Sequence, residues 1–204
     1  MTDELSVGFS YRSSSKLEFN GNAEFQKVPA SLKSTFPDGP GRTSITTPAT
    51  FFVGAACKVL QNLSIEADYQ FVGWSSFDQL KFDLDNGING QKEVAASRNY
   101  ENTYLLRFGF EYLMGELTFR GGYIFDRSPV PDGYVEPSLP DANRHDFTVG
   151  LGYRISEQLT IDASYMFVRF AQRTESQSIP EFNFNGTYNS FAHLFSVSVG
   201  YALE

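Results

Sequence analysis

The chain has 204 residues, a formal net charge of −8 and a pI of about 4.8, so it has no positive surplus with which to neutralise nucleic-acid phosphates. Its mean hydropathy is −0.28, and its longest apolar run, 51–57, is far shorter than the roughly 20 residues of a membrane-spanning helix. The charge therefore argues against a nucleic-acid-binding protein, and the short apolar runs exclude a helical membrane protein. The single cysteine, Cys57, excludes a disulfide framework within one chain.

Apolar and polar residues alternate along almost the whole chain, which is the period of a β-strand. Each alternating stretch approaches the roughly 9–11 residues with which a tilted strand crosses a bilayer. The pattern predicts an all-β, up-and-down antiparallel barrel. We expect about nine strands, at 5–11, 17–25, 49–57, 63–71, 104–112, 117–125, 147–153, 159–167 and 195–203.

The predicted connections alternate in length. The short ones are 13–15, 59–62, 113–115 and 156–158, and the long ones are 26–47, 78–98, 128–144 and 173–189. Successive connections of an up-and-down sheet lie at opposite ends. Short turns at one end and long loops at the other are typical of outer-membrane barrels, and a soluble meander has no reason to sort its loops in this way.

The alternation alone does not say which face meets lipid, because a soluble barrel or sandwich points its apolar face inward. Two features favour a membrane barrel: charged residues on the polar face, and aromatic residues that we expect near the short turns, where they would form an interfacial girdle. The charged residues are Glu66, Asp68, Arg107, Arg120, Asp126, Arg154 and Asp162, and the aromatic residues are Tyr11, Tyr112, Tyr153 and Tyr201. A soluble lipid-binding barrel is one alternative. Another is an outer-membrane barrel whose loops carry an adhesin or enzyme function.

The sequence offers no recognisable catalytic or metal-binding constellation. The two histidines, His145 and His193, are far apart and have no Cys or His at ligand spacing. Ser164 and Ser196 lie on polar faces, but no nucleophile motif surrounds them. We therefore expect no enzyme activity, no metal and no cofactor.

The stretch 125–144, FDRSPVPDGYVEPSLPDANR, holds four of the nine prolines and predicts a stiff, irregular loop between two strands. It resembles the F-D-x-S-P-x-P-D…P-D-x-x-R signature of the FadL family of outer-membrane channels for long-chain fatty acids and other hydrophobic compounds. The segments YQFVGWSSF at 69–77 and VGFSYRS at 7–13 also resemble family sequences. Together these similarities cover nearly the whole chain.

The resemblance implies a barrel of roughly fourteen strands, plugged by an N-terminal hatch, with a gap beside a kinked strand. Residues 1–204 would form the C-terminal portion of this single domain. The implied function is passive, porin-like uptake of long-chain fatty acids or hydrocarbons across the outer membrane of Gram-negative bacteria. The solute would leave laterally into the membrane, so its partners would be a hydrophobic small molecule and outer-membrane lipid.

A fatty-acid carboxylate needs a basic partner in a lumen of low dielectric constant. Arg107, Arg120 and Arg154 are the candidates, and the alternative is that they pair with Glu66, Asp68, Asp126 or Asp162. In the signature loop we expect the charged residues to brace the chain through hydrogen bonds. The signature residues are Asp126, Arg127, Ser128, Pro129, Pro131, Asp132, Pro140, Asp141 and Arg144.

A strand pattern follows Met1–Glu4 at once, without the basic and apolar regions of a secretion signal. We therefore expect the signal, the hatch and the first part of the barrel to belong to a missing N-terminal portion. A sheet of about nine strands has two open edges, which are prohibitively costly in lipid. We expect that the chain does not transport by itself.

Overall fold

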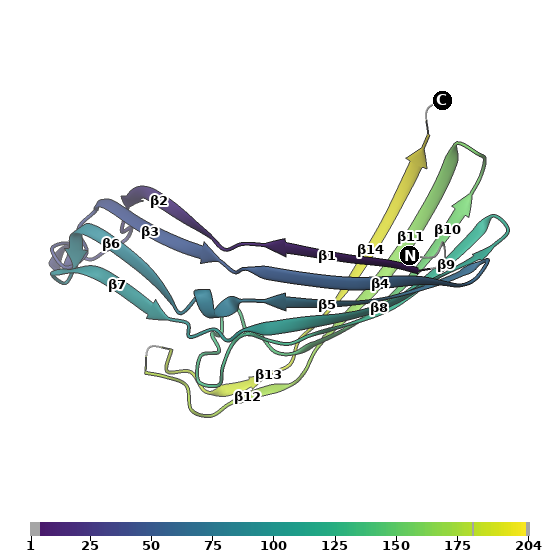
Figure 1. The fold of residues 1–204 in the computed structure, drawn as a ribbon. Coiled ribbons are helices and arrows are strands. Elements are labelled where there is room, and N and C mark those ends of the chain that lie inside the picture. Colours follow the sequence, from purple (N-terminus) through teal and green to yellow (C-terminus); the bar gives the residue numbers. More distant parts are fainter. Residues whose placement is uncertain (1–4, 181, 203–204) are drawn as a thin grey trace.

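The computed structural model describes residues 5–180 and 182–202 and is all-β. Within these residues, fourteen strands form three antiparallel sheets, and two short 3₁₀ helices, Ala30–Leu32 and Trp74–Ser76, lie in connections (Figure 1). No helix in the described part of the chain is long and apolar enough to cross a membrane. The strands are β1 (Leu5–Arg12), β2 (Ser15–Ala23), β3 (Gly39–Thr47), β4 (Thr50–Leu60), β5 (Leu63–Val72), β6 (Gln79–Ile88), β7 (Gln91–Ser97), β8 (Thr103–Met114), β9 (Leu117–Asp126), β10 (Arg144–Arg154), β11 (Leu159–Phe170), β12 (Arg173–Glu175), β13 (Gly186–Tyr188) and β14 (Phe191–Tyr201).

Eight strands form the largest sheet, in the order β1-β4-β5-β8-β9-β10-β11-β14, which we call the barrel sheet. Each strand pairs in antiparallel fashion with the strand that follows it along the chain within this sheet, as an up-and-down barrel requires. The sheet curves strongly but does not close, because β1 and β14 each have one neighbour in it (Figure 1). The predicted fold class is confirmed as part of an open barrel.

The barrel sheet has eight strands rather than about nine, because the predicted strand 17–25 forms outside it, mainly as β2. Its residues lie mainly in β2, which continues from β1 and pairs with β3, while β1 pairs with β4. The segment 13–15 is therefore a break in one long strand and not a turn. The strands β2, β3, β6 and β7 form a separate sheet that extends from one end of the barrel sheet (Figure 1).

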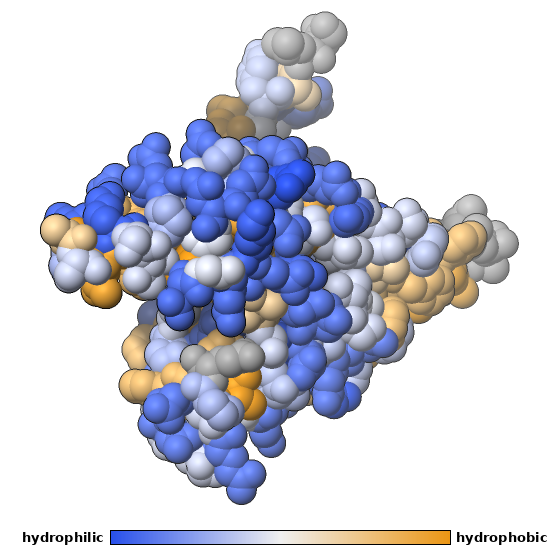
Figure 2. All heavy atoms as spheres, turned by 90° about the vertical axis from the view of Figure 1, so that its left-hand side faces the viewer, coloured by the Kyte–Doolittle hydropathy of each residue, from blue (hydrophilic) through white to orange (hydrophobic). Residues whose placement is uncertain are grey.

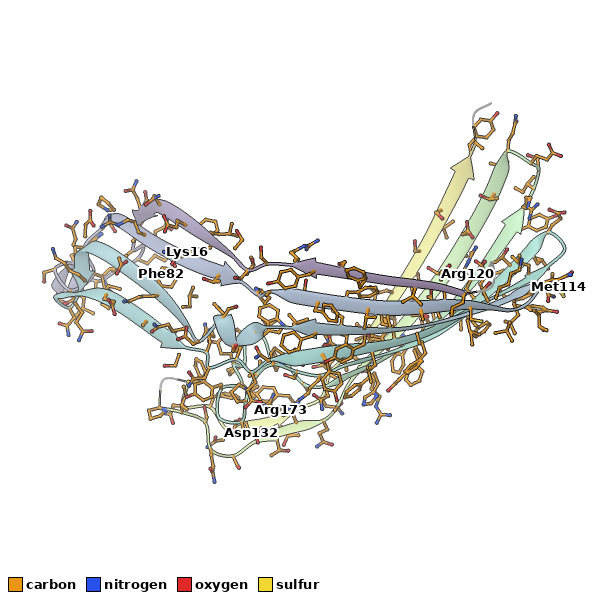
Figure 3. All side chains as sticks on the ribbon, in the orientation of Figure 1. Lys16, Phe82, Met114, Arg120, Asp132 and Arg173 are labelled. Carbon is orange, nitrogen blue, oxygen red and sulfur yellow. The ribbon has the colours of Figure 1, made fainter. Side chains whose placement is uncertain are left out.

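The connections sort by length as predicted, apart from the segment 13–15. The short turns 61–62, 115–116 and 155–158 lie together at one end of the barrel sheet, where Figure 3 places Met114. The long connections lie at the opposite end, which we call the loop end, and some carry strands of their own (Figure 1). Between strands of the barrel sheet they are 13–49, 73–102, 127–143 and 171–190.

The two faces of the barrel sheet differ as the alternation predicts, and we call them the apolar face and the polar face. Large side chains of the apolar face stand exposed: Phe9 is 81% and Phe195 is 78% accessible. Tyr112, Tyr153 and Tyr201 lie on this face near the short turns, as expected. Tyr11 was placed wrongly, because it pairs with Phe51 and lies at the loop end.

The buried side chains gather at the loop end. Within residues 5–180 and 182–202, those buried apart from glycines are Val72, Thr103, Val130, Val135, Ala142 and Glu175. Seen from this end, the surface is mostly hydrophilic, with hydrophobic residues on the flanks (Figure 2). The loops therefore have a small packed core, whereas the barrel sheet has none of its own.

Candidate functional site on the polar face

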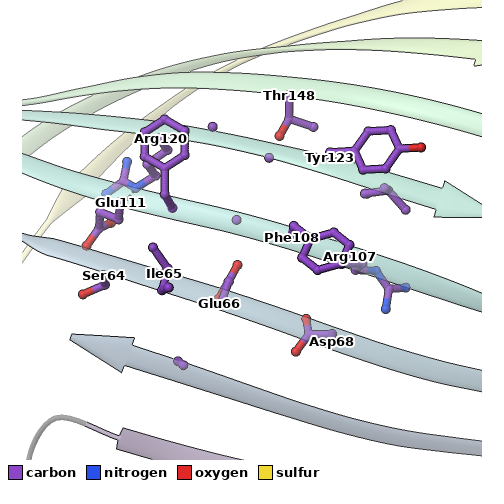
Figure 4. Close-up of a pocket in the computed structure, with 16 residues that line it drawn as sticks. Ser64, Ile65, Glu66, Asp68, Arg107, Phe108, Glu111, Arg120, Tyr123 and Thr148 are labelled. Carbon is purple, nitrogen blue, oxygen red and sulfur yellow. Dashed lines mark hydrogen bonds and ion pairs between the residues drawn. The ribbon is translucent and has the colours of Figure 1, made fainter. Parts of the chain in front are cut away.

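A hollow of about 400 Å³ lies on the polar face across β5, β8, β9 and β10 (Figure 4). Gly109 and Gly122 are opposite each other in the register and leave its floor without side chains. A Cβ on Gly109 would come 2.7 Å from Oε1 of Glu66, so this glycine makes room for the carboxylate. The charged and polar residues around the hollow include Glu66, Asp68, Arg107, Glu111, Arg120 and Thr148.

Arg120 is held by two carboxylates at one end of the hollow. Its Nε lies 2.7 Å from Oε2 of Glu111, and its Nη1 lies 2.7 Å from Oδ1 of Asp162. The three side chains come from three strands, β8, β9 and β11, so they tie the polar face together across the intervening β10. A guanidinium with two carboxylate partners has little capacity left for a third anion.

Arg107 has a different set of neighbours at the other end of the hollow (Figure 4). Its Nη2 donates a hydrogen bond of 2.8 Å to Oε1 of Gln70, and no carboxylate of the described chain lies within ion-pair distance. Asp68 is its register partner but leans over Gly54, where an added Cβ would collide with Oδ1. Arg107 is thus a half-buried cation with donors to spare.

Arg154 lies outside the hollow. Its Nε is 3.5 Å from Oε2 of Glu116, and the two side chains are 53% and 59% exposed beside the short turns. The structure therefore brings Arg107 and Arg120 to one hollow and leaves Arg154 at the end of the sheet.

Apolar side chains on the polar face were missed by the sequence prediction. Toward the loop end, Ile124 lies opposite Arg107, and Leu105 lies opposite Asp126. The signal was present as breaks in the strict alternation, where two apolar residues follow each other. The apolar residues of this region are Phe52, Leu105, Ile124, Met166, Val168, Phe170 and Leu194. The polar face thus offers apolar surface next to one cation that lacks a carboxylate partner.

The signature loop is the connection 127–143, which forms no strand apart from one isolated bridge. At its base, Arg144 forms an ion pair with Asp126 across β9 and β10. Within the loop, the Ser128 hydroxyl donates to Oδ2 of Asp141 over 2.7 Å.

Charged contacts join the signature loop to its two neighbours. Nη2 of Arg173 lies 3.0 Å from Oδ1 of Asp132, and Figure 3 shows the two side by side. Nη2 of Arg127 lies 3.7 Å from Oε2 of Glu101. The loop is thereby tied to the connection before β8 and to the one after β11.

Backbone groups and one buried carboxylate complete this contact region. We call it the loop cluster, and it consists of the signature loop 127–143 with Glu101 and residues 173–177. The Glu175 carboxylate is only 4% exposed and accepts N–H groups of Gly133 (2.6 Å) and Gln177 (3.0 Å). Val135 is fully buried. The Glu101 N–H donates to the Pro129 carbonyl over 2.8 Å.

Two further contacts lie at or beside the remaining prolines of the signature, Pro131 and Pro140. The Pro131 carbonyl accepts the Tyr134 N–H over 3.2 Å. The carbonyl of Asp141, the residue after Pro140, accepts Nη1 of Arg173 over 3.1 Å. Sequence reasoning missed Glu101, Arg173 and Glu175, because their roles depend on which loops meet at the loop end.

These features define a class of protein: an antiparallel transmembrane barrel with short turns at one end, elaborate loops at the other and a lumenal face of mixed polarity. Residues 1–203 match the family described as outer membrane protein transport protein (OMPP1/FadL/TodX). The chain belongs to this family, whose members are outer-membrane transport proteins.

Relatives and solved structures agree with this assignment. The putative outer membrane protein NMB0088 of Neisseria meningitidis serogroup B is 30% identical over 82% of this chain and 40% of its own length. The long-chain fatty acid transport protein of Escherichia coli O6:H1 is 27% identical over 96% of this chain and 46% of its own. The crystal structure of a Pseudomonas aeruginosa FadL homologue superposes with a TM-score of 0.84 at 21% identity, covering 98% of this chain and 50% of that one. The chain thus spans about half the length of these relatives.

Proposed function

We propose that this chain is the C-terminal portion of an outer-membrane channel of roughly fourteen strands that takes up hydrophobic small molecules passively. The observation that carries the proposal is the family match over residues 1–203, together with relatives named for long-chain fatty acid transport. In this proposal the protein transports its solute without chemical change and releases it laterally into the membrane.

Among hydrophobic solutes, Arg107 favours a long-chain fatty acid over a neutral hydrocarbon. Its guanidinium is half buried and bonded to the neutral Gln70, so it can accept a carboxylate without displacing another. Ile124 and Leu105 lie beside it and suit an acyl chain. Arg120 is saturated by Glu111 and Asp162, and we assign it to holding the polar face in shape.

The open edges bear on whether the chain works alone. β1 and β14 each present one unpaired edge, and unpaired backbone groups cost several kcal/mol each in lipid. We infer that an N-terminal portion, which supplies the remaining strands and the hatch, pairs with both edges. The isolated chain would then be unable to transport.

Uptake by the full-length protein tests this proposal, in cells that lack a fatty-acid transporter of their own. We expect uptake of radiolabelled long-chain fatty acid, and an Arg107→Gln variant that loses it several-fold while keeping uptake of a neutral hydrocarbon. Lys58→Gln, which removes a cation near the short turns, is the matched control and should behave as wild type.

Two results would overturn parts of the proposal. Full-length protein that folds in the outer membrane but takes up neither solute would contradict transport. Equal loss of fatty acid and hydrocarbon in Arg107→Gln would contradict a carboxylate-binding role and leave only a structural one.

A further inference from the structure

The apolar face of the barrel sheet contains a single formally charged side chain, Arg169. The register places every second residue of each strand on this face, and across all eight strands of the described sheet the other residues there are apolar, aromatic, glycine or histidine. A charge on the lipid side of a barrel costs about 2–4 kcal/mol at the bilayer midplane but only about 0–1 kcal/mol near the interface. The position of Arg169 along its strand therefore decides how much its charge costs.

Arg169 stands one residue before the end of β11, at the loop end and so at the level of lipid headgroups. Its neighbours across the sheet are His145 on β10 and Phe191 on β14. Its side chain is exposed, and no hydrogen bond or ion pair joins it to the described part of the chain. The guanidinium donors are consequently available to a partner in the membrane.

The two histidines of the chain lie on the same face near Arg169. The Nδ1 atom of His145 is 2.7 Å from the Tyr123 hydroxyl, and that of His193 is 2.7 Å from the Tyr165 hydroxyl. A ring whose Nδ1 accepts the tyrosine hydrogen carries its own hydrogen on Nε2. Each tyrosine thus holds a histidine ring in place, and in the tautomer in which the hydroxyl donates, the Nε2 N–H is the ring's remaining donor.

An apolar groove of about 810 Å³ lies one row of paired residues farther from the loops. It crosses from Phe147 on β10 to Ala55 on β4, and its lining is almost entirely apolar. Ala55, Ala67 and Gly121 keep it open because they are small, whereas Phe108 and Phe147 stand at 53% and 50% exposure beside them.

We propose that this face docks an anionic lipid of the loop-side leaflet, with its headgroup phosphate at Arg169 and His145 and one acyl chain in the groove. Arginine binds phosphate through two parallel N–H donors, and basic residues at a membrane surface recruit anionic lipids. The occupant is a lipid because the cation and the groove both lie on the face that meets the membrane. The proposal concerns lipid contact outside the barrel and does not depend on the transported solute.

The test uses the full-length protein in phosphatidylcholine nanodiscs that contain acyl-spin-labelled phosphatidic acid or phosphatidylcholine. We expect an immobilised signal that favours phosphatidic acid by about fivefold, the ratio that corresponds to about 1 kcal/mol per basic residue. Arg169→Gln should abolish this preference, and Arg169→Lys should keep part of it. Ala67→Phe, which fills the groove, should reduce immobilisation of both lipids.

Two controls accompany these variants. Lys58→Gln removes one positive charge on the polar face, and Val197→Phe enlarges the apolar face outside the groove; both should resemble wild type. Equal immobilisation of the two lipids by wild type, or a phosphatidic acid preference that survives Arg169→Gln, would overturn the proposal. Uptake is measured on the same variants. Normal uptake without a phosphatidic acid preference would overturn the lipid proposal alone, whereas lack of uptake by wild type would contradict the transport proposal alone.

Discussion

The barrel sheet and the loop cluster differ in whether they bury their apolar side chains. The barrel sheet exposes its large apolar side chains, and all residues of β1 and β14 are exposed. The loop cluster hides Val135 completely and satisfies the buried Glu175 with backbone N–H groups.

The difference follows from the surroundings of each region. A strand in a membrane barrel transfers its apolar side chains to lipid, so it needs neighbours for its backbone but no core for its side chains. The loops face water and must pack against one another. The sheet leaves its large apolar side chains and the outer edges of β1 and β14 without partners in the described chain, whereas the loop cluster makes its contacts within the chain.

The largest expected effect is on the loop cluster. Glu175→Ala leaves the buried Gly133 N–H without its acceptor, and we expect about 2–3 kcal/mol less local stability. Hydrogen exchange at Gly133 in the full-length protein measures this directly. Ser176→Ala, at the exposed neighbouring position, is the control. An equal loss of stability throughout the barrel sheet would contradict the independence of the two regions.

The ion pair at the base of the signature loop links the two regions. Arg144→Ala leaves the Asp126 carboxylate, whose side chain is 12% exposed, without its partner. We expect a loss of about 1–2 kcal/mol in urea unfolding from lipid vesicles, with faster proteolysis of 127–143. A cycle with Asp126→Asn should show that the two substitutions are not additive. Additive effects would mean that the pair does not hold the loop.

Two arginines of the barrel sheet provide a matched comparison. Arg120→Ala separates two carboxylates from their shared cation, and we expect about 1 kcal/mol of destabilisation because the side chains are partly screened. Arg154→Ala breaks one exposed pair and should cost less than about 0.5 kcal/mol. The same unfolding measurement ranks the two variants. A larger effect at Arg154 would contradict the role of Arg120 in holding the polar face in shape.

The smallest effect concerns the separate sheet formed by β2, β3, β6 and β7. The Phe25 N–H donates to Asp38 over 2.7 Å and, with Lys33 nearby, lowers the pKa of this carboxyl from its ordinary 3.8. The Asp38 carboxylate contributes its full stabilisation of the folded sheet above pH 3.8. This stabilisation disappears as the pH falls through the lowered pKa. Proteolysis of 24–38 should accelerate over this range, and Asp38→Asn should remove the dependence. A rate that responds to pH equally in the variant would rule out Asp38 as the cause.

The sequence predicted the barrel well because a period of two and the sorting of loop lengths are local properties. It misread 13–15 because a break within a long strand and a turn between two strands have the same small polar residues. Only the pairing of β2 with β3 distinguishes the two cases.

The candidate site was predicted only in part. Arg107, Arg120 and Arg154 were correctly placed on the polar face, but their partners were not determined by alternation. Gln70 at Arg107 and Glu116 at Arg154 depend on side-chain geometry across strands and turns. Glu175 was missed because its partner, Gly133, lies 42 positions away in another loop.

The central claim is that the apolar face meets lipid and the polar face lines a lumen. Spin labels placed one at a time along β14, from 193 to 199, test it in the full-length protein in lipid vesicles. Access to membrane-dissolved oxygen should peak at Phe195, Val197 and Val199, and access to a water-soluble nickel chelate should peak at Leu194, Ser196 and Ser198. Exclusion of both reagents from the apolar positions would show a soluble, inward-facing core and contradict the account.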